Sequence, residues 1–356
     1  MSSREIIRKI RELSYPPKHV NINNGRFNII ELLDKHNKDL INIINPIFEY
    51  IEENIDNIDN LLLMFRNGTY MIEILHDNPL TDIDKIINMI GNRYDIYVIY
   101  DKYMTKIYAT PRKYEETVKI LKELLNYGRP YALGIEYGVI HCSPLVTTRE
   151  NIRNIIQILK KAYSYMDKLS IYVRGILINI SYITDIDDIL RLVEEICRTG
   201  TCNESNIIEF MFEGTTITED SKIRVLPHEL VHRCVQLLER YRIPVFRIYP
   251  HTETSGYEIY MIGSEEMLSK ILSEISNITV VKTYEKYIGN MKETYVLVGE
   301  DENHVEKVRR EYEEYEKKFK EEIIRTAEKV AKEYGCFQYD EDIEELEDYF
   351  NDEEEC

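Results

Sequence analysis

The chain contains no tryptophan and only 14 glycines in 356 residues. No glycine-rich segment has the GxGxxG or Walker pattern, in which backbone amides surround a phosphate, so a nucleotide-driven activity is not expected. No apolar run approaches the ~18 residues that cross a membrane, and the N-terminal residues lack the apolar core of a signal peptide. These absences predict a cytoplasmic protein that does not associate with a membrane.

Cysteine is also scarce. The six cysteines include no CxxC pair, so a zinc knuckle is not expected. Abundant charge with few glycines is typical of hyperthermophilic proteins and favours an archaeal or viral source of that kind. Only Cys197 and Cys202 lie close together in the sequence. In a hyperthermophile cytoplasm they could form a disulfide, and two free thiols are the alternative interpretation.

Positively charged residues are also outnumbered. Lysine and arginine number 45 against 64 aspartates and glutamates, which gives a formal net charge of −19. A protein that coats DNA or RNA needs a cationic field to release phosphate counterions, so direct nucleic-acid binding is not favoured. A local basic patch, for example around Lys102 and Arg112, leaves such binding open as an alternative.

Negative charge gathers at the C-terminus. Residues 340–355 contain eleven aspartates and glutamates and no lysine or arginine. Such a segment is either a disordered, solubilising end or a docking segment. The acidic run is interrupted by Ile343, Leu346, Tyr349 and Phe350, and these apolar side chains favour docking to a basic partner or to the protein's own surface.

The hydrophobic pattern divides the chain into six segments. Residues 1–60 form a predicted N-terminal helical region, with helices over 5–13, 29–34 and 40–58. The period then becomes strand-like, and Asn67-Gly68 between two apolar runs is the strongest hairpin signal. The remaining predicted segments are units over 61–137, 138–218 and 219–300, a long helix over 301–335, and an acidic tail over 336–356.

Each of the three units has the predicted order strand, helix, strand, strand, helix, strand. This βαββαβ order is typical of ferredoxin-like folds, in which two helices back an antiparallel sheet. The sequence therefore predicts an α+β protein of tandem ferredoxin-like units, with an N-terminal helical region and a long C-terminal helix. The uncovered sheet faces are free to bind a partner. The long helix, about 50 Å at ~1.5 Å per residue, must bridge domains or pair with a second helix, which would give a homo-oligomer.

One catalytic motif is present. His228-Glu229-Leu230-Val231-His232 has the HExxH pattern, in which two histidines one helical turn apart bind zinc. In a metallopeptidase of this type His228 and His232 would be the metal ligands. Glu229 would act as the general base on a metal-bound water.

The residues around the motif argue against a zinc site. Pro227 places His228 in the first turn of the helix, where the backbone frays. The helix has an apolar stripe that turns both histidines roughly 135° away from the core, toward solvent or a rim; it consists of Leu230, Cys234, Leu237, Leu238 and Tyr241. No third ligand stands in a convincing position in the sequence.

The leading hypothesis is a non-enzymatic binding or regulatory protein that docks on a macromolecular partner, a basic protein or a nucleoprotein complex, and needs no cofactor. The first alternative is a zinc-dependent metallopeptidase that uses the HExxH segment. The second is a regulatory protein that binds a small effector between its units.

Overall fold

The structure is a computed structural model, and it describes residues 3–23, 26–33, 38, 40–66, 68–76, 94–110, 112–142, 145–147, 149–162, 169–173, 176–180, 185–198, 208–211, 217–218, 224–275 and 279–334. These residues form eight α-helices, two six-stranded antiparallel sheets and two three-stranded sheets. The predicted α+β class is confirmed. None of the helices in this part of the chain is both long and apolar enough to cross a bilayer.

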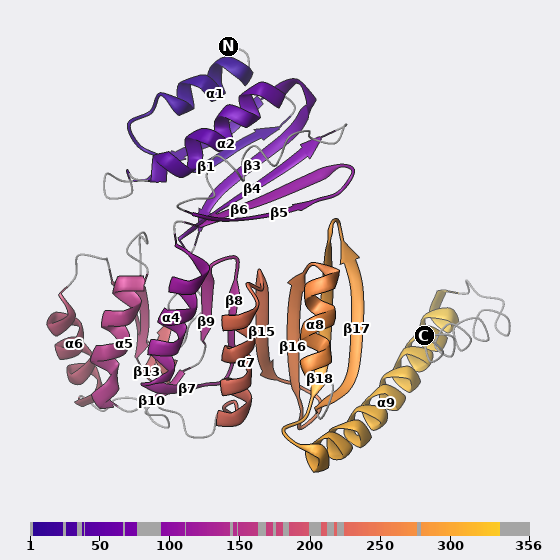
Figure 1. The fold of residues 1–356 in the computed structure, drawn as a ribbon. Helices are drawn as coiled ribbons and strands as arrows, with labels where there is room; N and C mark the ends of the chain where they lie inside the picture. The colour runs from indigo at the N-terminus through magenta and orange to yellow at the C-terminus, as the bar shows by residue number, and fades with distance from the viewer. Residues whose placement is uncertain are drawn as a thin grey trace.

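The first six-stranded sheet is formed by residues 17–110. Its strands are β1 (Pro17–Asn23), β2 (Arg26–Leu32), β3 (Ile58–Arg66), β4 (Thr69–His76), β5 (Asp95–Tyr100) and β6 (Met104–Thr110), in the order β2-β1-β3-β4-β6-β5. Helices α1 (Ser3–Arg11) and α2 (Ile41–Asn54) cover one face (Figure 1). The fully buried side chains between helices and sheet include Ile7, Ile47, Phe48, Leu61, Ile72 and Ile107.

The N-terminal region is only partly helical, which corrects the sequence prediction. The helix expected over 29–34 is wrong, because β2 places residues 29–32 in the sheet beside β1. Asn23 pairs with Arg26 across Asn24-Gly25, a dipeptide typical of two-residue hairpins. The hairpin dipeptide and the β-branched Ile29-Ile30 therefore indicate a strand, whereas the short apolar run alone resembles a helix.

Three hairpin turns have residues with positive φ, and one of them is the turn that joins Ile288 to Met291, where Gly289 has φ of 59°. The hairpin predicted at Asn67-Gly68 is confirmed by the pairing of Arg66 with Thr69, and Gly68 has φ of 76°. In the second sheet, the β8–β9 turn contains Tyr137 (φ 44°) and Gly138 (φ 82°). Two successive positive φ angles are typical of the type I′ turn, whose twist matches that of the strands it joins.

The second six-stranded sheet combines two distant stretches of the chain. Its strands are β8 (Leu133–Glu136), β9 (Val139–Cys142), β15 (Val245–Pro250), β16 (Tyr257–Gly263), β17 (Val280–Ile288) and β18 (Met291–Val298). They pair in the order β17-β18-β16-β15-β8-β9. Helices α4 (Tyr114–Leu125), α7 (His228–Arg240) and α8 (Glu265–Ile275) cover one face (Figure 1). The core beneath them includes Leu121, Leu238, Phe246, Ile248, Met261 and Val296.

The two six-stranded sheets share one strand order. Each consists of three hairpins side by side, and numbering the strands along the chain from 1 to 6 gives 2-1-3-4-6-5 in both sheets. Helices precede hairpins in the same way, as α2 precedes β3–β4 in the first sheet and α7 precedes β15–β16 in the second. The limit drawn from the sequence at 60/61 falls within β3, and the limit at 137/138 falls between the paired strands β8 and β9.

The chain between β9 and α7 is inserted into the second sheet. It contains β10 (Leu145–Thr147), α5 (Arg149–Ala162), β11 (Leu169–Val173), β12 (Ile176–Ile180), α6 (Ile186–Arg198), β13 (Ile208–Met211) and β14 (Ile217–Thr218). Strand β11 lies between β12 and β13, and β10 lies between β14 and β7 (Gly128–Pro130). The pairing with β10 holds β7 in place beside the end of α4.

Helix α9 spans Glu302–Tyr334. Its first turns pack on the second sheet, where Val305 and Val308 are buried and the Ser255 hydroxyl donates to Glu311 over 2.6 Å. Further along, Phe319 is 48% exposed, and Figure 1 shows the helix running away from the sheet. A second helix to pair with this exposed part stays a prediction.

The first sheet meets the second through β5 and β6. The Tyr108 ring stacks on Tyr137, with 3.7 Å between centroids and 7° between planes. The Arg242 guanidinium lies 3.0 Å from the Asp95 carboxylate, and the side-chain oxygen of Asn290 accepts the backbone N–H of Tyr100 over 3.0 Å. These contacts attach the first sheet to one end of the second.

The Tyr137 conformation can be tested by replacement. Asn tolerates a left-handed backbone better than Tyr, but Tyr137→Asn removes the ring that stacks on Tyr108. We expect the free energy of unfolding to fall by about 2–3 kcal/mol, because lost aromatic burial exceeds the ~1 kcal/mol of relieved backbone strain. Chemical denaturation measures this change, with Tyr15→Ala at an exposed tyrosine as the control. Unchanged stability of Tyr137→Asn would contradict a stabilising role for the stack.

Candidate functional site

The second sheet has one face that no described helix among α4, α7 and α8 covers, and we call it the open face. Along β15 and β16, Phe246, Ile248 and Ile259 point into the helical core, whereas Arg247 and Tyr260 are half-buried on the opposite side. This alternation follows from the two-residue period of a strand. The open face therefore carries the polar and aromatic half of each strand.

The strand registers align six residues of the open face into a cross-strand row. From β9 to β17 the row consists of His141, Gly134, Arg247, Tyr260, Tyr295 and Tyr284. Directly opposed residues in an antiparallel sheet share a face, so these side chains lie next to one another. The row spans all six strands and changes from charged to aromatic along its length.

At the charged end, Arg247 lies over Gly134. A Cβ at Gly134 would meet the Phe246 carbonyl oxygen at 2.1 Å and the Arg247 Cγ at 3.1 Å, so only glycine leaves the space that this arrangement occupies. The Arg247 guanidinium contacts the Glu136 carboxylate, whose Oε2 lies 3.1 Å from Nε2 of His141. The three side chains form one polar cluster.

Burial lowers the pKa of His141 to about 4. A neighbouring carboxylate alone would raise the pKa of an imidazole, but Glu136 is already compensated by the Arg247 guanidinium, so desolvation decides the direction. The His141 ring is therefore neutral at neutral pH. Its contact with Glu136 is therefore not an ion pair, and the ion pair of the cluster is the one between Arg247 and Glu136.

At the aromatic end, three tyrosine rings lie side by side. The centroids of Tyr260 and Tyr295 are 4.8 Å apart, and those of Tyr295 and Tyr284 are 6.2 Å apart. The hydroxyls of Tyr260 and Tyr295 donate to Oε1 of the buried Glu293 over 2.6 and 3.2 Å. Burial is the main reason that the pKa of Tyr260 rises to about 12, so its phenol stays a neutral donor. Tyr284 is 58% exposed and ends the row at solvent.

A further tyrosine–carboxylate pair lies beside the row. The Tyr249 hydroxyl donates to Glu258, and no cation among the described residues pairs with this carboxylate. Helix α9 borders this side, where the Lys282 ammonium lies 5.4 Å from the Tyr312 ring centroid. On the other side, Val245 and Ile262 are buried in the contact with the first sheet. The uncovered strip of the open face thus lies between α9 and the first sheet.

The HExxH segment forms the first turns of α7, on the helical side of the second sheet. The expected apolar stripe is confirmed, since Leu230, Cys234, Leu237 and Leu238 are buried. Helix α7 begins at His228, after Pro227, and both histidines are exposed. Their outward direction agrees with the sequence prediction.

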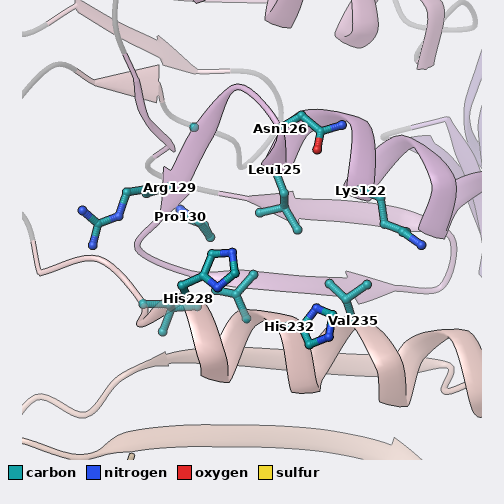
Figure 2. Close-up of a pocket in the computed structure, with 11 residues that line it drawn as sticks. Lys122, Leu125, Asn126, Arg129, Pro130, His228, His232 and Val235 are labelled. Atoms are coloured by element: carbon teal, nitrogen blue, oxygen red, sulfur yellow. The ribbon is translucent and has the colours of Figure 1, made fainter.

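Both histidines nevertheless line a pocket that the sequence did not indicate. Figure 2 shows the rings of His228 and His232 projecting from α7 toward Leu125, at the end of α4, and Pro130, on β7. Lys122 and Arg129 line the same pocket. No motif marks these two residues, because they come from a different helix and strand and join the histidines only when α4 packs beside α7.

The structure brings only part of the predicted zinc site together. No cluster of three or more histidine, cysteine, aspartate or glutamate side chains that could hold a metal occurs in the described part of the chain. Nε2 of His232 lies 2.9 Å from the Gln236 side-chain amide, and Glu229 is not a lining residue of the pocket. The zinc alternative, with Glu229 as base, stays a prediction.

Other residues singled out from the sequence can be placed as follows. The side chains of Ile343, Leu346, Tyr349, Phe350, Cys197 and Cys202 lie outside the described residues. Cys142 and Cys234 are free thiols buried in the core, and burial raises the pKa of each to about 12, which makes them poor nucleophiles. His141 lies on the open face, so it does not act as a base on Cys142.

Comparisons with known proteins give no match. No family model matches the chain, and neither a curated protein nor a solved structure matches it. The function must therefore be argued from the residues of the open face and the pocket.

The low pKa of His141 predicts a pH dependence of stability. Between about pH 6.5 and pH 4 the unfolded chain binds a proton at His141 that the folded chain does not, so stability falls as the pH drops through this window. The loss is on the order of 3 kcal/mol if the ordinary pKa of 6.5 applies to the unfolded chain. Denaturant unfolding from pH 7 to pH 4.5 measures it, and His141→Gln is expected to lose less stability than the wild type. Parallel curves for the two proteins would contradict the assignment.

Metal analysis tests the zinc alternative. Two imidazoles without a third protein ligand hold zinc weakly, so we expect much less than one zinc per chain after purification and dialysis. His232→Gln should leave that amount unchanged. About one zinc per chain, lost in the variant, would establish a metal site.

Proposed function

We propose that this protein is a non-enzymatic binding protein that docks a basic protein, alone or within a nucleoprotein complex, on the open face of the second sheet. The observation that carries this proposal is the cross-strand row, whose aromatic end passes over β16, β18 and β17 to solvent. Tyrosine is well suited to such a surface, because it gives a large apolar contact at a low cost in side-chain entropy.

The chemistry of the strip favours cationic side chains. Lysine and arginine are attracted to the faces of aromatic rings, and Tyr260, Tyr295 and Tyr284 offer three adjacent rings. Glu258, beside Tyr249, adds a carboxylate that has no cation among the described residues. Other charges of the strip compensate one another in pairs. Arg247 pairs with Glu136, and Lys286 lies 2.7 Å from Glu293.

A nucleic-acid strand fits the same strip less well. Bases could stack on the tyrosines, but the phosphates of the strand would also need free cations nearby. The cations of the strip are already engaged, since Lys286 lies 2.7 Å from Glu293 and Lys282 lies 2.7 Å from Glu316. The chain as a whole carries a net charge of −19 and would repel a polyanion. A basic protein is attracted both to the tyrosine rings and to the net negative charge of the chain.

The predicted ferredoxin-like units are proposed in a permuted form. A ferredoxin-like sheet has the strand order 4-1-3-2. In the second sheet the neighbouring strands β15-β16-β18-β17 have this order if β15, the first of them in the chain, takes the place of strand 4. In the first sheet β3-β4-β6-β5 have the same order, with β3 in the place of strand 4. An additional hairpin then extends each sheet. This proposal is supported by the strand order alone, and it explains why one face of each sheet lacks helices.

The long helix and the acidic tail are proposed to extend the docking surface. Helix α9 borders the open face at Tyr312, and its exposed Phe319 lies in the part that leaves the sheet. The apolar tail residues Ile343, Leu346, Tyr349 and Phe350 follow this helix in the sequence. In this proposal the carboxylates of the acidic tail give additional contacts to a basic partner that is bound on the open face.

Substitution of one tyrosine tests the docking surface. A lysine- and arginine-rich peptide of about ten residues is the probe, and its affinity is measured by fluorescence anisotropy. Tyr284→Ala should weaken binding by roughly fivefold to tenfold, the loss of one cation–π contact. Glu258→Gln should weaken binding by a similar factor and reduce its dependence on salt, because an uncompensated carboxylate is lost.

The same strand provides a matched control. Tyr287 is 65% exposed, but it contacts Glu265 of α8 and so lies on the helical side of the sheet. Tyr287→Ala should therefore bind the peptide as the wild type does. Equal losses in both alanine variants, or none in Tyr284→Ala, would exclude the open face. Tighter binding of a single-stranded oligonucleotide than of the basic peptide would exclude a basic protein as the partner.

A further inference from the structure

A pocket lies on the helical side of the second sheet, away from the open face. It lies between α7 on one side and the end of α4 with β7 on the other, and its volume is about 320 Å³ (Figure 2). Ligand pockets in proteins measure ~300–1,000 Å³, so this one is suited to a single small molecule. Its apolar lining consists of Leu125, Pro130, Leu226, Val231 and Val235.

The polar lining of the pocket is basic. Lys122, Arg129, His228 and His232 line it, and no described aspartate or glutamate does so. This composition contrasts with the rest of the chain, in which acidic residues outnumber lysine and arginine by 64 to 45. Lysine and arginine side chains at the edge of one cavity attract an entering anion.

Lys122 and Arg129, on the wall formed by α4 and β7, differ in whether a carboxylate of the protein already pairs with them. The Lys122 ammonium lies 2.5 Å from Glu239 of α7, so part of its charge is compensated within the protein. The exposed Arg129 side chain has no ion-pair or hydrogen-bond partner among the described residues. Its guanidinium is thus available to a ligand, and its planar fork matches the oxygens of a phosphate.

The walls of the pocket are fixed to each other by the fold. The backbone N–H of Leu226, just before α7, donates to the carbonyl of Pro130 on β7 over 2.8 Å. Strand β7 is held in turn by β10, where Arg129 is paired with Val146. The Lys122–Glu239 ion pair joins α4 to α7. A site whose walls are attached at three points is organised before a ligand arrives, which lowers the cost of binding.

We infer that this pocket binds a small phosphomonoester with an apolar ring system, of the size of a nucleoside monophosphate. The Arg129 side chain, which is turned outward at the rim in Figure 2, swings inward to meet the phosphate beside His228, and the ring system lies on the apolar lining toward His232. The Asn126 side-chain amide, also a lining residue, can exchange hydrogen bonds with a polar ring edge. Such binding needs no glycine-rich loop, because side chains supply the positive charge.

Calorimetric titration of the full chain tests this site with three probes. Adenosine 5′-monophosphate should bind, inorganic phosphate should bind at least tenfold more weakly because it leaves the apolar lining unused, and adenosine should not bind measurably because it lacks the charge. Arg129→Gln should weaken binding of the monophosphate by about tenfold, the loss of one charge-assisted contact. His228→Gln should also weaken it.

The control is another exposed arginine of the same region. Arg233 follows His232 on α7 but does not line this pocket, so Arg233→Gln should bind as the wild type does. Thermal unfolding of each variant confirms that it folds. Equal losses in Arg129→Gln and Arg233→Gln would overturn the assignment, and so would adenosine binding as well as its monophosphate. Stabilisation by zinc that is lost in His232→Gln would overturn it in favour of a metal site. Because Tyr284→Ala leaves this pocket intact, failure here does not affect the docking proposal.

Discussion

The pairing of β8 with β15 is the contact on which the rest of the second sheet depends. It joins residues 133–136 to residues 245–248, across more than a hundred residues of intervening chain. On one face it places Arg247 over Gly134 and beside Glu136. On the other face it places α7 next to α4, which forms the pocket. Closing so long a loop costs entropy, and the buried core between the three helices and the sheet offsets that cost.

The two proposed sites use opposite charge within one acidic chain. On the open face, tyrosines and Glu258, which has no cationic partner among the described residues, are proposed to favour a cationic partner, in agreement with the net charge of the protein. In the pocket, Arg129 and its neighbours create a local positive potential against that background. Helices and sheet separate the two sites, so each can be occupied without direct contact between the ligands. We therefore propose one surface for a protein and one cavity for a small anion.

Much of the local structure could be predicted from particular residues. Asn67-Gly68 indicated its hairpin, and the stripe from Leu230 to Leu238 indicated the buried side of α7. The helix expected over 29–34 was wrong because an apolar pair was given more weight than Asn24-Gly25 before it. The tyrosines of the row, Tyr260, Tyr284 and Tyr295, were visible in the sequence. Their alignment into one row was not, because register depends on which strands become neighbours.

The sequence by itself determined the α+β class, most helices and hairpins, and which side of each element is apolar, because periodicity and turn chemistry act within a few residues. Only the tertiary structure decided that Lys122 and Arg129 share a pocket with His228 and His232, and that Arg247 meets Glu136. These residues are far apart in the chain, and no local pattern links them. They come together because strands pair and helices pack over long sequence separations, which a single sequence records only as many small, distributed preferences.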